Sequence, residues 1–297
     1  MSSRLFALIG SVALLLSAGC NLSSDDAGEA QAAATPSAPT GIIPGMKIRP
    51  GIDESCLVVA SEPATEAGGT TTARAPSYQA LDSVTDGGTI QGTISYNGSL
   101  TDEVVDIVSD KSVCEDPATP GKRKTDSLLA KNGKLQNAVV TLTDIKSGKG
   151  FEQQTVTLNN QGCMFEPRIT LMRKGDIVAA TNSDPVLHNT HLYLKRKTGN
   201  KELENIALAS KGAVVKKKVK KAGLVDVKCD AHRWMQGWIV VTDHPYSALT
   251  DANGSFSLTD VPPGDYTLRV WHEKLSAKEV KVSVAAGTDV TSDVTLE

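Results

Sequence analysis

Two apolar runs separated by a short loop make up the stretch Gly223-Leu-Val-Asp-Val-Lys-Cys-Asp-Ala-His-Arg-Trp-Met-Gln-Gly-Trp-Ile-Val-Val. Valine and isoleucine are enriched in strands, so the two runs predict a pair of β-strands. The loop between them has the spacing Cys-x-x-His-x-x-Met. A tight connection between two strands can direct Cys229, His232 and Met235 toward one centre.

A fourth donor must come from upstream, where His188 and His191 lie three positions apart. Strand side chains alternate between faces, so these two histidines face opposite ways on a strand. One thiolate, two imidazoles and one thioether are the ligand set of a mononuclear electron-transfer copper site. The sequence therefore predicts one type 1 copper ion bound by His188, Cys229, His232 and Met235, with His191 as the alternative to His188.

Three segments between about Phe151 and Asp243 carry a resemblance to a known family: Phe165-Glu-Pro-Arg-Ile-Thr-Leu-Met-Arg-Lys-Gly-Asp-Ile-Val, Asn182-Ser-Asp-Pro-Val-Leu-His-Asn-Thr-His and the stretch quoted above. They resemble the cupredoxins, most closely the amicyanin and plastocyanin-like blue copper domains. The resemblance implies a Greek-key β-sandwich with the same four copper ligands. It also implies that Asn189 hydrogen-bonds between the two ligand loops.

The sequence departs from that family at three places. Val225 stands where many members have an aromatic residue, Trp234 stands where amicyanin has Phe, and no Pro follows His232. These departures bear on the redox potential more than on the site itself. The loop lacks the second Cys of a binuclear copper centre, and the chain has no Cys-x-x-Cys-His motif for covalent haem.

The N-terminus predicts export. Arg4 precedes an apolar run from Leu5 to Leu16, which has the length of a signal peptide and is too short to span a bilayer. The run ends in Leu16-Ser-Ala-Gly-Cys, which resembles a bacterial lipobox, although Ser17 stands where Leu is commoner. We therefore expect residues 1–20 to be a lipoprotein signal peptide and Cys20 to carry the lipid, with an ordinary secretory signal as the alternative. The expected location is periplasmic or cell-surface, anchored to a membrane by lipid.

Five cysteines occur in the chain, and two of them already have expected roles in lipid attachment and metal binding. Spare cysteines of an exported domain tend to oxidise in pairs. Cys114 and Cys163 are the expected disulfide because both lie in the part predicted to fold, which leaves Cys56 unpaired. The sequence alone does not fix this pairing.

Residues 21–86 are rich in Ala, Ser, Thr, Pro and Gly, and acidic residues outnumber basic ones there. Such a stretch cannot bury enough apolar surface to offset the entropy of ordering it. It is predicted to be a flexible linker, disordered between the anchor and the folded part.

The remaining sequence predicts an all-β fold, because short alternating apolar runs recur between turn residues. Residues 246–297 resemble a carboxypeptidase regulatory-like β-sandwich, with an Asn253-Gly254 hairpin turn and Tyr266 as a tyrosine corner. The strand pair that opens that family lies upstream, within residues 87–148. We therefore expect a discontinuous sandwich of 87–148 and 246–297, with the cupredoxin domain of 149–245 inserted in it. Two consecutive sandwiches are the alternative.

The predicted function is single-electron transfer with an unidentified redox partner protein, and no substrate pocket, base or nucleophile indicates an enzyme. The alternatives are storage or delivery of Cu(I), and a metal-free structural surface lipoprotein. The stretch from Lys211 to Lys228 holds seven lysines and one acidic residue. It can be a docking face for an acidic partner or the solvated side of edge strands. Export and a net charge of −3 argue against nucleic-acid binding.

Overall fold

The structure is a computed structural model that describes residues 77–101 and 103–297. In these two ranges nearly every regular element is a β-strand, and the one helix is α1 (Lys111–Cys114). The prediction of an all-β fold is confirmed. The predicted signal peptide, Cys20 and Cys56 lie outside the described residues. Among the helices of the described part, none has the length and apolar character needed to cross a membrane.

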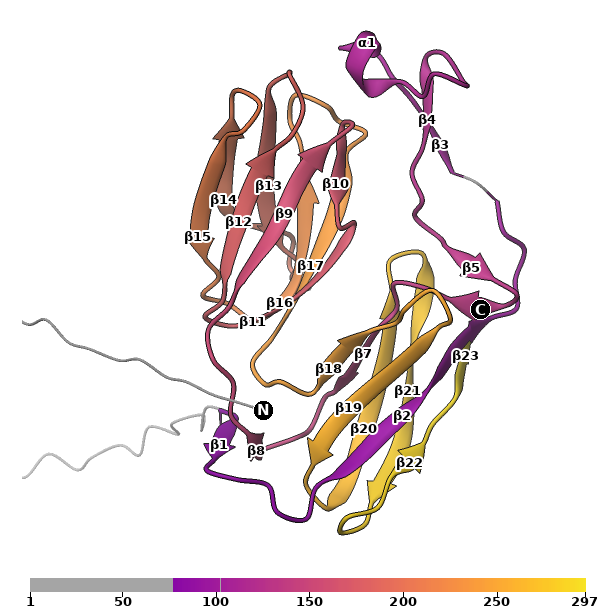
Figure 1. Cartoon of the computed structure of the whole chain (residues 1–297), viewed down its shortest axis with the longest axis vertical. Coiled ribbons are helices and arrows are strands. Elements are labelled where there is room, and N and C mark those ends of the chain that lie inside the picture. The colour runs from indigo at the N-terminus through magenta and orange to yellow at the C-terminus, as the bar shows by residue number, and fades with distance from the viewer. Residues whose placement is uncertain (1–76, 102) are drawn as a thin grey trace, which may run out of the picture. The chain divides into compact units, whose positions relative to one another are not determined.

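One sandwich contains the predicted ligand segments. Its first sheet has the strand order β10-β9-β12-β15, and its second has the order β11-β17-β16-β13-β14 (Figure 1). The strands of the first sheet are β9 (Thr155–Gln161), β10 (Met164–Glu166), β12 (Ile177–Asn182) and β15 (Val214–Lys218). The strands of the second sheet are β11 (Ile169–Arg173), β13 (His188–Leu194), β14 (Lys201–Leu208), β16 (Gly223–Lys228) and β17 (Gln236–Thr242).

The two sheets of this sandwich share one apolar core. Leu158 and Val178 of the first sheet pack in the same cluster as Leu192, Val227 and Ile239 of the second. Buried side chains alternate with less buried ones along most of β17, because successive side chains of a strand point to opposite faces of the sheet. The lysine-rich strand β15 lies at a sheet edge, where exposed lysines oppose the addition of a further strand.

A second sandwich surrounds a separate core. Its sheets have the orders β18-β7-β20-β21 and β19-β2-β6-β5, and β22 and β23 also pair with β2. The strands are β2 (Gly88–Tyr96), β5 (Ala130–Lys131), β6 (Lys134–Leu135), β7 (Val139–Leu142), β18 (Ser247–Leu249), β19 (Ser255–Val261), β20 (Gly264–His272), β21 (Leu275–Val284), β22 (Val290–Thr291) and β23 (Val294–Leu296). Hydrogen bonds thus join strands that precede residues 149–245 in the chain to strands that follow them. The domain boundaries themselves remain predictions.

The sequence predicts a tyrosine corner and a hairpin turn in this sandwich, and the structure agrees fully only with the first. The Tyr266 hydroxyl donates to the carbonyl of Pro262 at 2.8 Å, which is the expected tyrosine corner. A turn does form at Asn253-Gly254, where Gly254 has φ +70°. The flanking strands β18 and β19 do not pair as a hairpin, because β18 pairs with β7 and β19 pairs with β2. The turn carries the chain from one sheet to the other.

A short strand lies within the C-terminal end of the predicted linker. Strand β1 (Gln79–Leu81) pairs in parallel with β8 (Ser147–Lys149). The Tyr78 hydroxyl donates to the carbonyl of Lys149 at 2.6 Å, and its ring lies 6.3 Å from that of Tyr246. An aromatic side chain with a polar partner thus orders a segment that has no alternating pattern of its own.

A segment of residues 103–124, here called the arm, separates β2 from β5. It contains β3 (Val104–Asp106), α1 and β4 (Lys122–Lys124), and β3 pairs with β4. Ile107 and Cys114 of the arm belong to the core cluster of the first sandwich. Cys114 forms a disulfide with Cys163, which follows β9. The arm is therefore attached to the sandwich that contains the predicted ligands.

Tyr246 supplies a test of the second core. Its side chain is fully buried, and its hydroxyl donates to the Asp260 carbonyl at 2.7 Å and accepts from the Lys149 amide at 2.8 Å. We expect Tyr246→Phe to lower the free energy of unfolding by about 2 kcal/mol, because two backbone groups lose their partner. Chemical denaturation measures the change. Tyr96→Phe is the control, since the Tyr96 hydroxyl is bonded at an exposed site, and an equal loss in both variants would contradict the prediction.

Candidate metal centre

Three of the predicted ligands meet where β13 begins and β16 ends. His188 is the first residue of β13, Cys229 directly follows β16, and His232 lies in the loop before β17. All three are buried, with exposed fractions of 0%, 2% and 1%. The antiparallel pairing of β13 with β16 brings the two ligand segments together, although 41 residues separate His188 from Cys229.

The distances among these side chains fit a single metal ion. The Cys229 Sγ lies 4.0 Å from the Nδ1 of His188 and 3.8 Å from the Nδ1 of His232. Ligands at roughly 2.0–2.3 Å from one ion in a trigonal plane are about 3.5–4 Å apart. The third edge, between the two Nδ1 atoms, is shorter at 3.0 Å. One sulfur and two nitrogen atoms therefore converge on one point with spacings close to those of a trigonal site.

The two facing ring nitrogens require a proton or a metal ion between them. An unprotonated Nδ1 carries a lone pair, and two lone pairs 3.0 Å apart repel each other unless a proton or a metal ion lies between them. Burial excludes the water that would otherwise screen this repulsion. The donor set and its geometry thus fit a soft or borderline cation such as copper.

Met235, the fourth predicted ligand, is 1% exposed and belongs to the same core cluster as Cys229. Its backbone amide donates to the carbonyl of His232 at 2.9 Å, so a tight turn returns the chain toward the sandwich. Its place in the buried cluster that contains Cys229 is consistent with a weak axial ligand, and that role stays a prediction.

Asn189 connects the two ligand segments. Its Oδ1 accepts from the backbone amides of Asp230 at 2.7 Å and Ala231 at 3.3 Å, and it lies 3.3 Å from the Cys229 Sγ. The Asn189 backbone amide also points at that sulfur, at 3.4 Å. The side chain therefore fixes the start of the ligand loop and orients the thiol, in the manner expected from the sequence.

The surroundings of Cys229 favour its charged form. Burial alone would raise the pKa of the thiol, but hydrogen bonds with His188, His232 and the Asn189 amide outweigh burial and lower this pKa to about 6. Burial also opposes the charged form of His232, while its hydrogen bonds to Cys229 and Asp110 raise its pKa overall. These contacts thus favour negative charge on the sulfur and positive charge on the neighbouring imidazole.

His191, the alternative to His188, lies elsewhere. Its Nδ1 lies 2.9 Å from the Asp230 carboxylate and 2.9 Å from the Tyr193 hydroxyl. Its Nε2 has no hydrogen-bond partner among the described residues and lies 3.5 Å from the Glu202 carboxylate. The structure therefore groups His188, and not His191, with Cys229 and His232.

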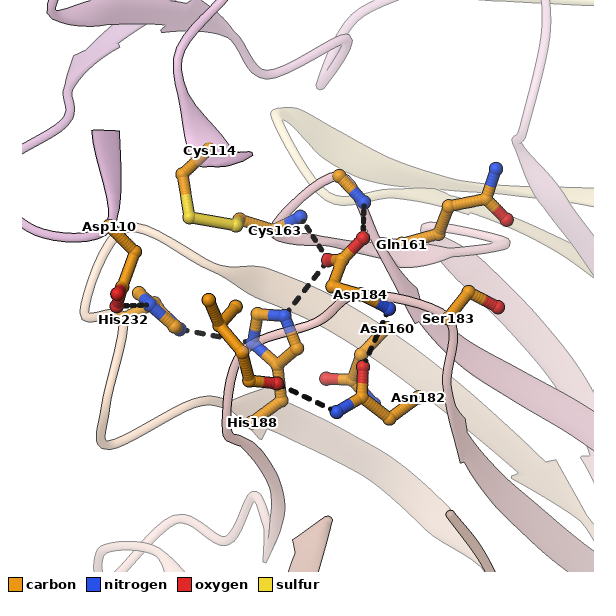
Figure 2. Close-up of polar contacts among 12 residues, drawn as sticks. Asp110, Cys114, Asn160, Gln161, Cys163, Asn182, Ser183, Asp184, His188 and His232 are labelled. Carbon is orange, nitrogen blue, oxygen red and sulfur yellow. Dashed lines mark hydrogen bonds and ion pairs between the residues drawn. A yellow bond between two sulfur atoms is a disulfide. The ribbon is translucent and has the colours of Figure 1, made fainter. Parts of the chain in front are cut away.

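Two carboxylates hold the outer nitrogens of the ligand imidazoles. Asp184 lies 2.9 Å from the Nε2 of His188, and Asp110 lies 2.8 Å from the Nε2 of His232 (Figure 2). A carboxylate at Nε2 keeps the proton on that nitrogen and leaves Nδ1 free to bind a metal. Sequence reasoning missed both residues. Asp184 stands four positions before His188 and could have been noticed, whereas Asp110 is 122 positions away from His232.

The remaining features at this site are a disulfide and an indole. The Cys114–Cys163 disulfide expected from the sequence is present, and its sulfur atoms lie within 4.8 Å of a His232 nitrogen. The Trp234 ring lies 5.0 Å from the His232 ring, and its buried Nε1 has no hydrogen-bond partner in the described part of the chain. Both groups cover the His232 side of the cluster.

The C-terminal part of the chain matches a known family model. Residues 238–297 match the carboxypeptidase regulatory-like domain, which supports the resemblance stated for residues 246–297. Comparison of the whole sequence with curated proteins finds no match.

Several solved structures are similar to part of this chain. A proline mutant of reduced amicyanin has 23% identity and a TM-score of 0.26, covering 29% of this chain and 81% of amicyanin. A purple cupredoxin from Nitrosopumilus maritimus has 22% identity and a TM-score of 0.25, covering 31% of this chain and 100% of the cupredoxin. A copper-containing nitrite reductase from Thermus scotoductus has 21% identity and a TM-score of 0.27, covering 33% of this chain and 24% of the reductase. The similarity to cupredoxins is therefore distant and partial.

Proposed function

We propose that this protein binds one type 1 copper ion through His188, Cys229, His232 and Met235 and carries single electrons. The observation that supports the proposal most strongly is the convergence of Cys229 Sγ and the two Nδ1 atoms within 4.0 Å of one another. A bound copper ion would supply reversible one-electron chemistry. The protein would contribute the plane of three strong ligands and a buried thioether.

Hydrogen bonds from the polypeptide restrain these ligands. Asn189 contacts the Cys229 sulfur from its backbone and its side chain, and carboxylates fix both imidazoles. Side chains restrained in this way reorganise little when the charge at the site changes, which suits electron transfer. The burial of all four side chains also excludes water from the site.

The alternatives fit the site less well. A protein that delivers Cu(I) needs an accessible site, whereas these ligands are at most 2% exposed. A metal-free structural role would leave two imidazole nitrogens facing each other at 3.0 Å with a proton as their only mediator. Both arguments favour a resident copper ion.

We propose that the protein works outside the cytoplasm, anchored by lipid on Cys20, and exchanges electrons with a partner protein. The Cys114–Cys163 disulfide supports an oxidising compartment, since disulfides persist mainly in exported proteins. The lipobox-like sequence that ends at Cys20 supports the anchor.

Copper titration of the full chain tests the proposed site. We expect added Cu(II) to give an intense visible band from thiolate-to-copper charge transfer, and Cys229→Ser to abolish it because serine offers no thiolate. His188→Ala should lower the copper affinity by more than ~10-fold. Absorption spectroscopy and competition with a chelator measure the two effects.

His191→Ala is the matched control, because His191 lies on the same strand but outside the cluster. This variant should keep the band. A colourless protein that holds Cu(I) and yields it readily to a chelator would show storage or delivery instead. Absence of copper uptake would indicate a structural protein.

The preformed thiolate gives a second prediction. In the metal-free protein, the ultraviolet absorbance of the Cys229 thiolate should rise with a midpoint at pH about 6. Because folding lowers this pKa, the associated stabilisation is complete above the ordinary pKa of a thiol, shrinks as the pH falls below that value and is lost as the pH passes through about 6. The difference in absorbance between the wild-type chain and Cys229→Ser isolates this thiol from the other cysteines. A midpoint near that of an ordinary thiol would show that the imidazoles do not stabilise the anion.

A further inference from the structure

The arm lies against the metal centre through apolar contacts and one covalent bond. Ile107 belongs to the core cluster of the first sandwich, and Val113 packs against that cluster. The Cys114–Cys163 disulfide joins the arm to the segment after β9. Arg123 adds a hydrogen bond from its guanidinium to the Cys114 carbonyl at 3.0 Å. The short helix α1 is therefore fixed beside the cluster.

Asp110 precedes α1 in an unusual conformation. It occupies the N-cap position, but its backbone is left-handed, with φ 46° and ψ 37°, and its side chain makes no capping hydrogen bond. An Asp at this position ordinarily caps the helix from an extended conformation. Here its carboxylate contacts the His232 Nε2 instead, at 2.8 Å. Asp110 thus leaves the helix without a side-chain cap and has an uncommon backbone conformation, and its carboxylate contacts the imidazole.

A continuous series of hydrogen bonds and side-chain contacts links the disulfide to both imidazoles. The Asp110 carbonyl accepts from the Cys114 amide at 2.9 Å, so one helical turn connects Asp110 to the disulfide. On the other side, the Asp184 carboxylate accepts from the Cys163 amide at 2.8 Å and contacts the His188 imidazole. Figure 2 shows the contacts that run from Asp110 through His232, His188 and Asp184 to the Cys163–Cys114 disulfide.

We propose that Asp110 is a positioning residue of the metal centre, which the Cys114–Cys163 disulfide holds against His232. Asp110 accepts the Nε2 proton of His232 and thereby keeps Nδ1 available as a ligand. The inference rests on the proposed function for the identity of the bound ion, whereas the hydrogen bond itself belongs to the metal-free protein.

The Cys114–Cys163 disulfide acts as a tether for Asp110. This matters because the side chain of Asp110 is far more exposed than that of Asp184, which contacts the other imidazole. The side chain of Asp110 is 45% exposed, compared with 9% for Asp184. An exposed hydrogen bond competes with water and contributes little unless its partners are held in position. The disulfide and the buried Ile107 restrict the arm, so Asp110 stays within reach of an imidazole that is itself 1% exposed.

Nuclear magnetic resonance of the full chain with isotope-labelled histidine tests the hydrogen bond without metal. We expect a slowly exchanging Nε2–H proton on His232 in the wild-type protein and its loss in Asp110→Ala. Asp110→Asn should retain part of the signal, because an amide oxygen still accepts the proton. The Nε2–H proton of His188, held by Asp184, should persist in every variant and report that the site remains folded.

The matched control is Asp106→Ala, which removes the same charge from an exposed position on the same arm. Copper affinity, measured by competition with a chelator, should fall by about 10–100-fold in Asp110→Ala and stay unchanged in Asp106→Ala. The double variant Cys114→Ser with Cys163→Ser should also lose the His232 signal, because the arm is released.

The outcomes separate this inference from the proposed function. A His232 signal that survives in Asp110→Ala, or equal copper affinities in Asp110→Ala and Asp106→Ala, would overturn the role of Asp110. An unchanged His232 signal in the disulfide variant would overturn the role of the tether. A wild-type chain with the Asp110-dependent signal but without copper binding would support the positioning of His232 and overturn the copper function.

Discussion

The register between β13 and β16 is the constraint on which the candidate metal centre depends. His191 pairs with Lys228 and Leu192 pairs with Val227 in this antiparallel ladder. This register places His188, at the start of β13, beside the loop that follows β16. Because side chains alternate along a strand, a slip of one residue would send His188 to the opposite face. The buried Leu192 and Val227 oppose such a slip, since it would expose them.

The same strand supports polar networks on both of its faces. His188 faces the sulfur of Cys229, whereas His191 faces Asp230, and Asn189 between them contacts both Cys229 and Asp230. A displacement of the ligand loop would therefore break hydrogen bonds on both faces of the strand. This coupling explains how a short loop can hold the Cys229 sulfur close to two imidazoles.

The sequence was sufficient to predict the parts of the site that are local or that depend on alternation along strands. The spacing from Cys229 to His232 lies within one loop, and the separation of His188 from His191 by three positions already indicated opposite faces. Asp110 was not predictable in this way. It lies in a segment without a periodic pattern, and its contact with His232 depends on where the disulfide and Ile107 fix the arm.

For the fold too, local sequence did not predict features that depend on distant contacts. The C-terminal end of the predicted linker and the Asn253-Gly254 turn are two examples. Tyr78 orders β1 through contacts with residues about 70 or more positions away, which no local pattern records. The Asn-Gly pair does form a turn, as local chemistry requires. The partners of the two strands that flank it are decided by the sheets already present, so β18 joins β7 and β19 joins β2.

The candidate metal centre has contacts with residues of the arm, which lies outside the segment that contains the proposed ligands. Residues 149–245 supply every proposed ligand, but Asp110 and Cys114 lie outside that range and precede it in the chain. A carboxylate that fixes the tautomer of a ligand histidine affects how well the site is prepared for its ion. One segment thus provides the proposed ligands, and a covalently attached arm provides the carboxylate that contacts one of them. The Cys114–Cys163 disulfide adds a covalent link between these two parts to the apolar contacts of Ile107.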